Sequence, residues 1–263
     1  MWEHLHSLLN SFLTLMALGA VCIILQKLFP SAPGQKLWRK ESRLDLTYWL
    51  FITIFLGYIT LFTAGILLTI IAVHFSPALL LRINSADSGS IKIYQVLLSI
   101  VLLDFIAYWV HRMFHGSHLW KYHSIHHSSK EIDWLSAVRF HPLETVIITT
   151  ITYCICISCG FGFKEVALAL TLRSFYGYLV HANVSWHFGP LGYIFASPYF
   201  HRWHHAKDKA ALDKNFGGVF SLWDFIFRTA YFPKNLQPRN FGVMDDVGKN
   251  FWQQLLYPFR HSK

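Results

Sequence analysis

The sequence predicts an all-α integral membrane protein with about four to five apolar helices and a cytoplasmic, histidine-rich helical cap. Three observations lead to this prediction. Hydrophobic residues make up 54% of the 263 residues and charged residues only 14%, whereas an ordinary soluble domain carries about 25% charged residues. Several apolar stretches reach the roughly 20 residues that an α-helix needs to cross a bilayer. Histidines recur at helical spacing after these stretches.

The apolar stretches predict the helices in chain order. Residues 8–28 form the first, which is ended by Pro30, Pro33 and Gly34. Residues 48–73 and 93–110 form the next two, separated by a polar loop at 84–90. A helical hairpin is expected from 146–161 and 166–180, around the glycines at 160 and 162. The chain from 186 onward is polar and aromatic, which predicts a cap rather than another span.

The basic residues predict the orientation in the membrane. The loop after the first helix carries four of them: Lys36, Arg39, Lys40 and Arg43. The loop after the second helix has only Arg82 and Lys92, so the first loop is expected to be cytoplasmic. Counting the spans forward then brings all the histidine runs to the cytoplasmic side. Because the net charge of +9 gathers at the ends of apolar stretches, anionic lipid headgroups explain it and no nucleic-acid partner is predicted.

Three histidine runs each place their imidazoles at i and i+4, or at i, i+3 and i+4, which is one face of a helix. The runs consist of His111 and His115; His123, His126 and His127; and His201, His204 and His205. Neutral imidazole suits iron, copper, zinc and nickel. A zinc hydrolase site with three protein ligands would leave most of these histidines idle. Two irons with open positions for dioxygen use the ligand set best, so we expect a two-metal site.

Asp104 is the second informative feature. Asp104, Tyr108, His111 and His115 step by four, three and four residues and therefore share one helix face. An acid within an apolar span suggests a functional role, and we assign Asp104 and Tyr108 to the catalytic site. Since Asp104 lies roughly 10 Å along the helix from His111, it is expected to orient a histidine of a neighbouring element. The alternative is an ion pair with Arg173, and the two roles are compatible.

Six motifs over about residues 95–230 resemble the fatty acid hydroxylase/sterol desaturase superfamily of membrane di-iron oxygenases. They are Asp104-x-x-x-Tyr108-Trp109-x-His111-Arg112-x-x-His115; His123-x-x-His126-His127-Ser128; Arg139-Phe-His-Pro-Leu-Glu144; His181-Ala-Asn183; Ser197-Pro-x-x-His201-Arg202-x-His204-His205; and Asn215-Phe-Gly…Leu222-Trp-Asp224. The resemblance implies N-terminal transmembrane helices in 1–92, a catalytic domain in 93–235 and a C-terminal tail in 236–263.

The resemblance also implies which residues bind iron. All eight histidines of the runs become ligands, and His181 is added to them. Some members carry a second histidine four residues after this one, where the present chain has Ser185. Whether His187 or His141 also binds metal is left open by the sequence.

The function implied is hydroxylation of a lipid C–H bond with O2 and external electrons. The substrate class includes fatty acyl lipids, sterols and related lipids. Electrons are expected from a separate cytochrome b5-type or ferredoxin-type donor, because the chain shows no dinucleotide fingerprint. Desaturation on the same site is the alternative within the family. A metal transporter or metal-binding membrane module is the alternative from another class. We expect a multi-pass protein of the bacterial inner membrane, or of the endoplasmic reticulum in a eukaryote.

Overall fold

A computed structural model of the chain describes residues 2–74, 90–116, 118–234 and 236–260. The described residues are helical and contain no β-strand, which confirms the all-α prediction. The elements are α1 (Trp2–Leu28), α2 (Ser42–Phe51), η1 (Ile52–Leu56), α3 (Gly57–His74), α5 (Ile93–Phe114), α6 (Trp120–His127), η2 (Trp134–Val138), α7 (Pro142–Ser158), α8 (Phe163–His181), η3 (Gly189–Tyr193), α9 (Pro198–His204), η4 (Lys209–Ala211), α10 (Leu222–Ile226), α11 (Phe251–Leu256) and η5 (Tyr257–Phe259). Of the polar loop predicted at 84–90, residues 84–89 lie outside the described residues.

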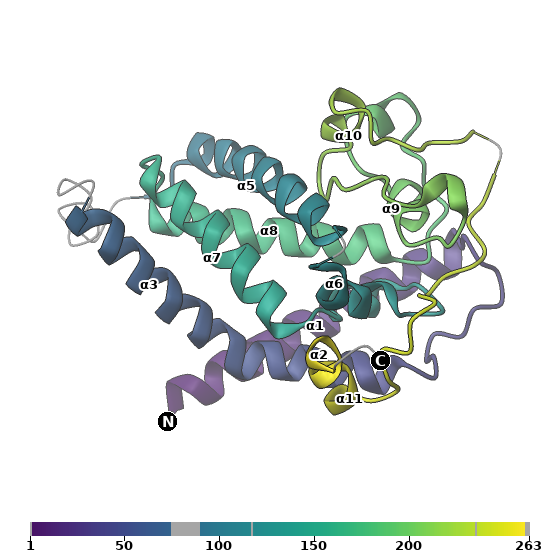
Figure 1. Cartoon of the computed structure of the whole chain (residues 1–263), viewed down its shortest axis with the longest axis horizontal. Coiled ribbons are helices and arrows are strands. Elements are labelled where there is room, and N and C mark those ends of the chain that lie inside the picture. Colours follow the sequence, from purple (N-terminus) through teal and green to yellow (C-terminus); the bar gives the residue numbers. More distant parts are fainter. Residues whose placement is uncertain (1, 75–89, 117, 235, 261–263) are drawn as a thin grey trace.

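Three helical stretches are long and apolar enough to cross a membrane: Leu9–Leu28, Ser42–His74 and Ile93–Phe114. Helix α7 is a shorter apolar helix. Within the bundle, α5 packs against α8 and α3 against α7, and Figure 1 shows these four helices extending together away from the compact half that holds α6, α9 and α10. The chain is therefore a membrane protein with a helical cap at one end of its bundle.

The stretch Ser42–His74 is continuous but not uniform. Between α2 and α3 it contains the π-helical turn η1, Ile52–Leu56. A π-turn bonds residue i to i+5 and is uncommon in helices, where it often marks a functional site. The single helix predicted at 48–73 is confirmed, with this interruption that the hydrophobic pattern does not reveal.

The predicted hairpin corresponds to α7 and α8. Helix α7 begins at Pro142, whose fixed φ and missing N–H suit the first turn of a helix. His141 caps this end by accepting a hydrogen bond from the backbone N–H of Leu143 at 3.2 Å. Gly160 makes the turn between the helices with φ at +91°, a conformation that costs glycine little. The hairpin therefore leaves the cap and returns to it, so that His181 lies at the cap end.

The loop after α1 is joined to the cap by a buried network of charges. Arg39 donates to Asp133 at 2.6 Å and to Asp45 at 2.7 Å. Arg139 donates to the other oxygen of Asp45 at 2.7 Å. Because removing one member would leave an unpaired buried charge, this network fixes η2 against the start of α2. Arg39 is thus buried, whereas Lys36 and Lys40 of the same loop and Arg43 in the first turn of α2 are exposed.

Helix α1 packs closely against the cap at Gly19. A Cβ added there would lie 2.7 Å from the ring of Trp134 in η2. Leucine at this position should therefore force the two elements apart and destabilise the protein by about 1–3 kcal/mol. Thermal unfolding in detergent of Gly19→Leu measures the effect. Gly65→Leu on α3 is the control, because its Cβ would meet no atom within 4 Å. Equal unfolding temperatures for the two variants would contradict the close packing of α1 on Trp134.

Candidate metal centre

The nine histidines that the sequence singles out lie together at the cap end of the bundle. They come from α5, α6, the last residue of α8, and α9, with His115 and His205 following α5 and α9 directly. Their ring nitrogens form two groups in which the ligand atoms lie within 4.8 Å of one another. The first histidine group is His111, His115, His123, His127 and His204. The second histidine group is His126, His181, His201 and His205.

Within each group the Nε2 atoms are spaced as the ligands of one metal ion would be. In the first group, His123 Nε2 lies 2.9 Å from His111 Nε2 and 3.1 Å from His127 Nε2. In the second, His181 Nε2 lies 3.0 Å from His201 Nε2 and 3.2 Å from His205 Nε2. Two nitrogens that each lie about 2.1 Å from a metal ion, at a right angle, are about 3 Å apart. The observed spacing matches this value.

The opposite ring nitrogen, Nδ1, is held by backbone carbonyl groups in four of the histidines. The pairs are His111 with Phe216 at 2.8 Å, His126 with Arg139 at 3.1 Å, His181 with Gly177 at 2.7 Å and His204 with Lys214 at 2.7 Å. A carbonyl oxygen only accepts, so Nδ1 carries the proton in each pair. In a neutral imidazole the Nε2 atom is then unprotonated and carries a free lone pair.

These fixed tautomers imply a cation. The Nε2 atoms of His126 and His181 are both unprotonated, and yet they lie only 3.2 Å apart. Two lone pairs at this distance repel each other, and a shared positive ion relieves the repulsion. The buried Nε2 atoms of His115 and His204 have no hydrogen-bond partner among the described residues, which also suits metal ligands. The donor set therefore fits two metal ions, one for each group.

The two groups lie side by side. The ring centroids of His127, in the first group, and His205, in the second, are 4.4 Å apart. His201 and His204, one from each group, are stacked with centroids 5.3 Å apart. Adjacent residues of one helix thus serve different groups, since α6 and α9 each contribute to both. A substrate at the boundary between the groups would face both metal positions.

Burial makes these imidazoles neutral. Removal from water, and next the neighbouring imidazoles, lower the pKa of His127 and of His201 well below the ordinary value of histidine. The same two causes, in the same order, lower the pKa of His204 and His205. Metal binding requires deprotonated imidazole, so near neutral pH the cap presents its ligands without having to release protons.

Two histidines are held by carboxylates instead of carbonyls. His123 Nδ1 lies 2.5 Å from Glu144 Oε1, and Glu144 is fully buried in the first turn of α7. His115 Nδ1 lies 3.1 Å from Asp213 Oδ1. A carboxylate in this position orients a ligating imidazole and raises its basicity. Glu144 lies within one of the six sequence motifs, but no role was predicted for it. Its signal was an acid at the start of an apolar helix.

Asp104 does not bond directly to a histidine among the described residues. It is fully buried and accepts hydrogen bonds from the backbone N–H groups of Val219 and Phe220, each at 2.9 Å. Its Oδ1 also lies 3.5 Å from Arg173 Nε, which is the ion pair expected as the alternative. Asp104 therefore acts on the loop 213–221, whose carbonyl at Phe216 orients His111.

The same loop is held by residues to which sequence reasoning assigned no role. Asp224 accepts from the backbone N–H groups of Phe216 at 2.8 Å and of Gly217 at 2.7 Å. Asn215 adopts a left-handed φ of +60° and donates to the carbonyl of Phe200 at 2.9 Å. Because the loop orients its histidines through backbone carbonyls, no residue type could have revealed the role beforehand.

Tyr108 points toward the cap but not into either group. Its hydroxyl lies 2.8 Å from Thr229 Oγ1, and its ring stacks on Phe227. Thr229 in turn donates to Asp224 at 2.6 Å. Tyr108 thus adds to the support of the loop 213–221. Of the two histidines left open, His141 caps α7 and also contacts the Leu255 carbonyl at 3.1 Å, whereas His187 stacks on Tyr199. Both lie outside the two groups.

A cavity of about 290 Å³ adjoins both groups. Its walls include His111 and His123 of the first group and His126, His181 and His201 of the second. The rest of the lining includes residues of α5, α7 and α8, such as Ala107, Ile148 and Gly177, together with Ile52 of η1, Val138 of η2 and Gly218 of the loop 213–221. The cavity thus connects the histidines with the interior of the helical bundle.

Replacing Glu144 by glutamine should weaken metal binding by about 10- to 100-fold, because His123 loses its charged hydrogen-bond partner. Metal retained after dialysis against a graded series of chelator concentrations measures the change. Glu165→Gln is the matched control: Glu165 is also a buried glutamate in the first turn of an apolar helix, but its carboxylate bonds to the backbone of Lys92. Equal retention by both variants would contradict the orienting role of Glu144.

Asp104→Asn and Asp45→Asn should each loosen a different group. The first change removes one acceptor from the N–H groups of loop 213–221, which orients His111 and His204. The second weakens the hold on Arg139, whose carbonyl orients His126. Each change should lower binding of one of two metal ions by about tenfold, the cost of one hydrogen bond to a charged group. Metal stoichiometry together with hydrogen exchange at Val219 and Phe220, faster only in Asp104→Asn, separates the two. Exchange that rises equally in both variants would refute this division.

The comparisons with known proteins agree with the histidine arrangement. Residues 96–229 match the fatty acid hydroxylase family. An ornithine lipid hydroxylase of Rhizobium tropici is 32% identical over 167 residues, which cover 63% of this chain and 50% of the relative. The human alkylglycerol monooxygenase is 34% identical over 128 residues, covering 48% of this chain and 28% of the relative. A C-4 methylsterol oxidase of Schizosaccharomyces pombe is 29% identical over 145 residues, which cover 52% of this chain and 47% of the relative.

The chain thus spans half or less of the length of these curated relatives. No solved structure matches it. The family match itself, residues 96–229, extends over slightly more than half of the chain and includes all nine histidines of the two groups. The chain therefore belongs to the fatty acid hydroxylase family.

Proposed function

We propose that this protein is a membrane di-iron oxygenase that hydroxylates a C–H bond of a lipid with O2 and external electrons. The observation that supports it most directly is the convergence of nine imidazoles, several with fixed tautomers, on two neighbouring points. The nine histidines of the two groups are the proposed iron ligands. The names of the relatives point to lipids: an ornithine lipid, alkylglycerols and a methylsterol.

Iron would supply the activation of dioxygen. The reaction balances with two electrons and two protons: the substrate C–H bond breaks, one oxygen atom forms the alcohol and the other leaves as water. Desaturation, the alternative on the same site, would release both oxygen atoms as water. The protein itself would contribute binding and positioning. The histidines hold the ions, Glu144 and the loop 213–221 orient the histidines, and the cavity positions the lipid away from water.

The lining of the cavity favours an apolar substrate. This lining includes Ala107 of α5 and Ile52 of η1, and both residues lie in candidate membrane spans. A lipid could therefore reach the histidines without leaving the bilayer. Arg173 and Glu144 also line the cavity, so it offers polar groups beside the apolar ones. A fatty acyl lipid, a sterol or a related lipid fits this combination.

We further propose a separate electron donor of the cytochrome b5 or ferredoxin type and a cytoplasmic position for the metal centre. The exposed Lys36, Lys40 and Arg43 beside the cap favour that orientation by the positive-inside rule. A bacterial inner membrane is the favoured location, with the endoplasmic reticulum for a eukaryotic host.

A single-turnover experiment tests the function without the donor. The purified protein is loaded with iron-57, reduced anaerobically in nanodiscs of host lipid, freed of reductant and exposed to oxygen-18 gas. We expect about two irons per chain, one for each group, a coupled di-iron Mössbauer signal, and one oxygen-18 atom in a hydroxylated lipid. Two ferrous ions carry the two electrons that one turnover requires.

Two histidine variants test which residues bind the iron. His181→Ala should lower the iron content and abolish labelling, because three Nε2 atoms of the second group surround His181 Nε2. His187→Ala is the control, since His187 lies outside both groups. A new double bond without oxygen-18 in the lipid would assign desaturation. Zinc as the only metal, with no labelling after iron loading, would contradict the oxygenase and favour a metal-binding module.

A further inference from the structure

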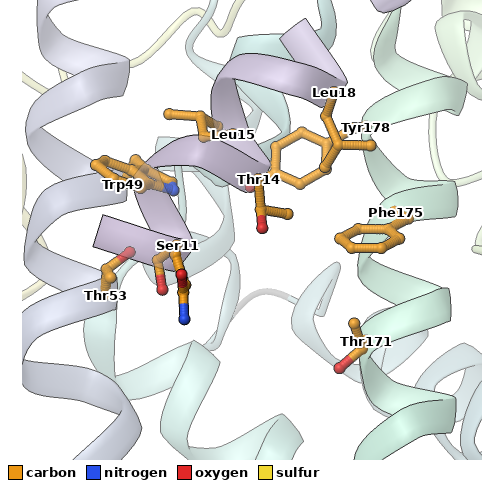
Figure 2. A pocket seen from close by; sticks show the side chains of 10 residues that line it. Ser11, Thr14, Leu15, Leu18, Trp49, Thr53, Thr171, Phe175 and Tyr178 are labelled. Carbon is orange, nitrogen blue, oxygen red and sulfur yellow. The ribbon is translucent and has the colours of Figure 1, made fainter. Parts of the chain in front are cut away.

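A second hollow, separate from the histidine cavity, lies on the membrane side of the bundle. This α1–α8 groove has a volume of about 680 Å³ and is lined by residues of α1, α2, η1 and α8. Figure 2 shows Thr14 and Leu18 of α1 opposite Phe175 and Tyr178 of α8, with Trp49 and Thr53 closing the third side.

The groove and the histidine cavity share a wall. Tyr178 lines both of them. On α8, Ser174 lines the cavity and the next residue, Phe175, lines the groove. On the π-turn η1, Ile52 lines the cavity and Thr53 the groove. Two pairs of successive residues therefore face two different hollows, and the side chain of Tyr178 stands between them.

The chemistry of the groove suits a hydrocarbon chain. Six of the ten described residues that line it carry a hydroxyl or amide group, but none is charged and most of the lining surface is apolar. The hydroxyl of Thr171 is already bonded to the carbonyl of Ala167 in its own helix at 2.9 Å. An isolated charged headgroup would find no counter-charge there, and leaving it unpaired would be costly.

The position of the groove makes such a chain available. Helix α1 and the stretch that contains α2 and η1 are both candidate membrane spans. On α1, the neighbouring Leu13 and Met16 are more than half exposed, as side chains facing lipid tails would be. The groove is therefore open to the region in which acyl chains lie.

We propose that the α1–α8 groove binds a hydrocarbon chain of a membrane lipid and guides it past Tyr178 into the histidine cavity. This inference rests on the proposed function, since it names the route by which the lipid substrate approaches the metal centre. It assigns α1 a role in substrate binding, although α1 lies outside the region that matches the family.

Photolabelling tests the groove independently of activity. The full chain is reconstituted in nanodiscs that contain phosphatidylcholine with a diazirine in one acyl chain, irradiated, digested and analysed by mass spectrometry. We expect crosslinks on groove residues of α1 and α8, such as Thr14 and Phe175, in addition to the outer surface. Crosslinks confined to the outer positions, such as Leu13 and Met16, would overturn the proposal.

A matched pair of tryptophan variants tests whether the groove leads to the cavity. Thr14→Trp should fill the groove and reduce both its crosslinking and oxygen-18 incorporation into lipid by about tenfold, the effect of overpacking by somewhat more than 1 kcal/mol. Leu13→Trp, one residue away and not among the residues that line the groove, should leave both unchanged. Iron content should equal that of the unmodified protein in both variants, which confirms that the metal centre has folded.

The outcomes separate this inference from the proposed function. Labelled groove residues together with no oxygen-18 incorporation in any sample would leave the lipid-binding groove standing and contradict the oxygenase. Normal oxygen-18 incorporation in Thr14→Trp would overturn the route through the groove and leave the oxygenase standing.

Discussion

The direction in which each imidazole points is the constraint on which the rest of the structure depends. Four Nδ1 atoms donate to backbone carbonyls, which leaves the Nε2 atoms of these histidines unprotonated, and those of His126 and His181 lie 3.2 Å apart. Such an arrangement is unfavourable by itself and becomes favourable with a cation between the nitrogens. The cap must therefore be rigid enough to keep the imidazoles in place. This explains why so many polar side chains of the cap are buried and why several of them hold its backbone by hydrogen bonds.

The rigidity comes from carboxylates that do not touch the metal positions. Asp104 and Asp224 hold the loop 213–221 by its N–H groups, and Asp45 holds Arg139. In each case a buried acid immobilises a backbone segment, and a carbonyl of that segment orients a histidine. The first histidine group depends in this way on α5, and the second on α2. The membrane helices thus determine the geometry of a centre that lies at their ends.

Much of this could be predicted from the sequence, for identifiable reasons. Apolar length revealed the helices, because a bilayer requires about 20 residues. Helical spacing revealed the histidines, because i and i+4 share a face. Asp104 was noticed as an acid in a span, but two of its partners are backbone N–H groups of residues more than 100 positions away. Backbone partners have no sequence signal, and neither the loop 213–221 nor the role of Asp45 could be anticipated. The expected pairing of Asp104 with Arg173 is present.

The π-turn η1 has a consequence for how such a protein can diversify. A π-turn accommodates one residue more than the α-helical turn it replaces, and one residue corresponds to a rotation of about 100° along an α-helix. Everything after Leu56 is therefore rotated relative to α2 by the presence of a single residue. Insertions and deletions at this point change which side chains of α3 face the bundle and how Ile52 and Thr53 divide the two hollows, while the histidines stay where they are. The chain thus contains a position where a change in length, rather than in residue type, can reshape the two hollows while the two histidine groups stay unchanged.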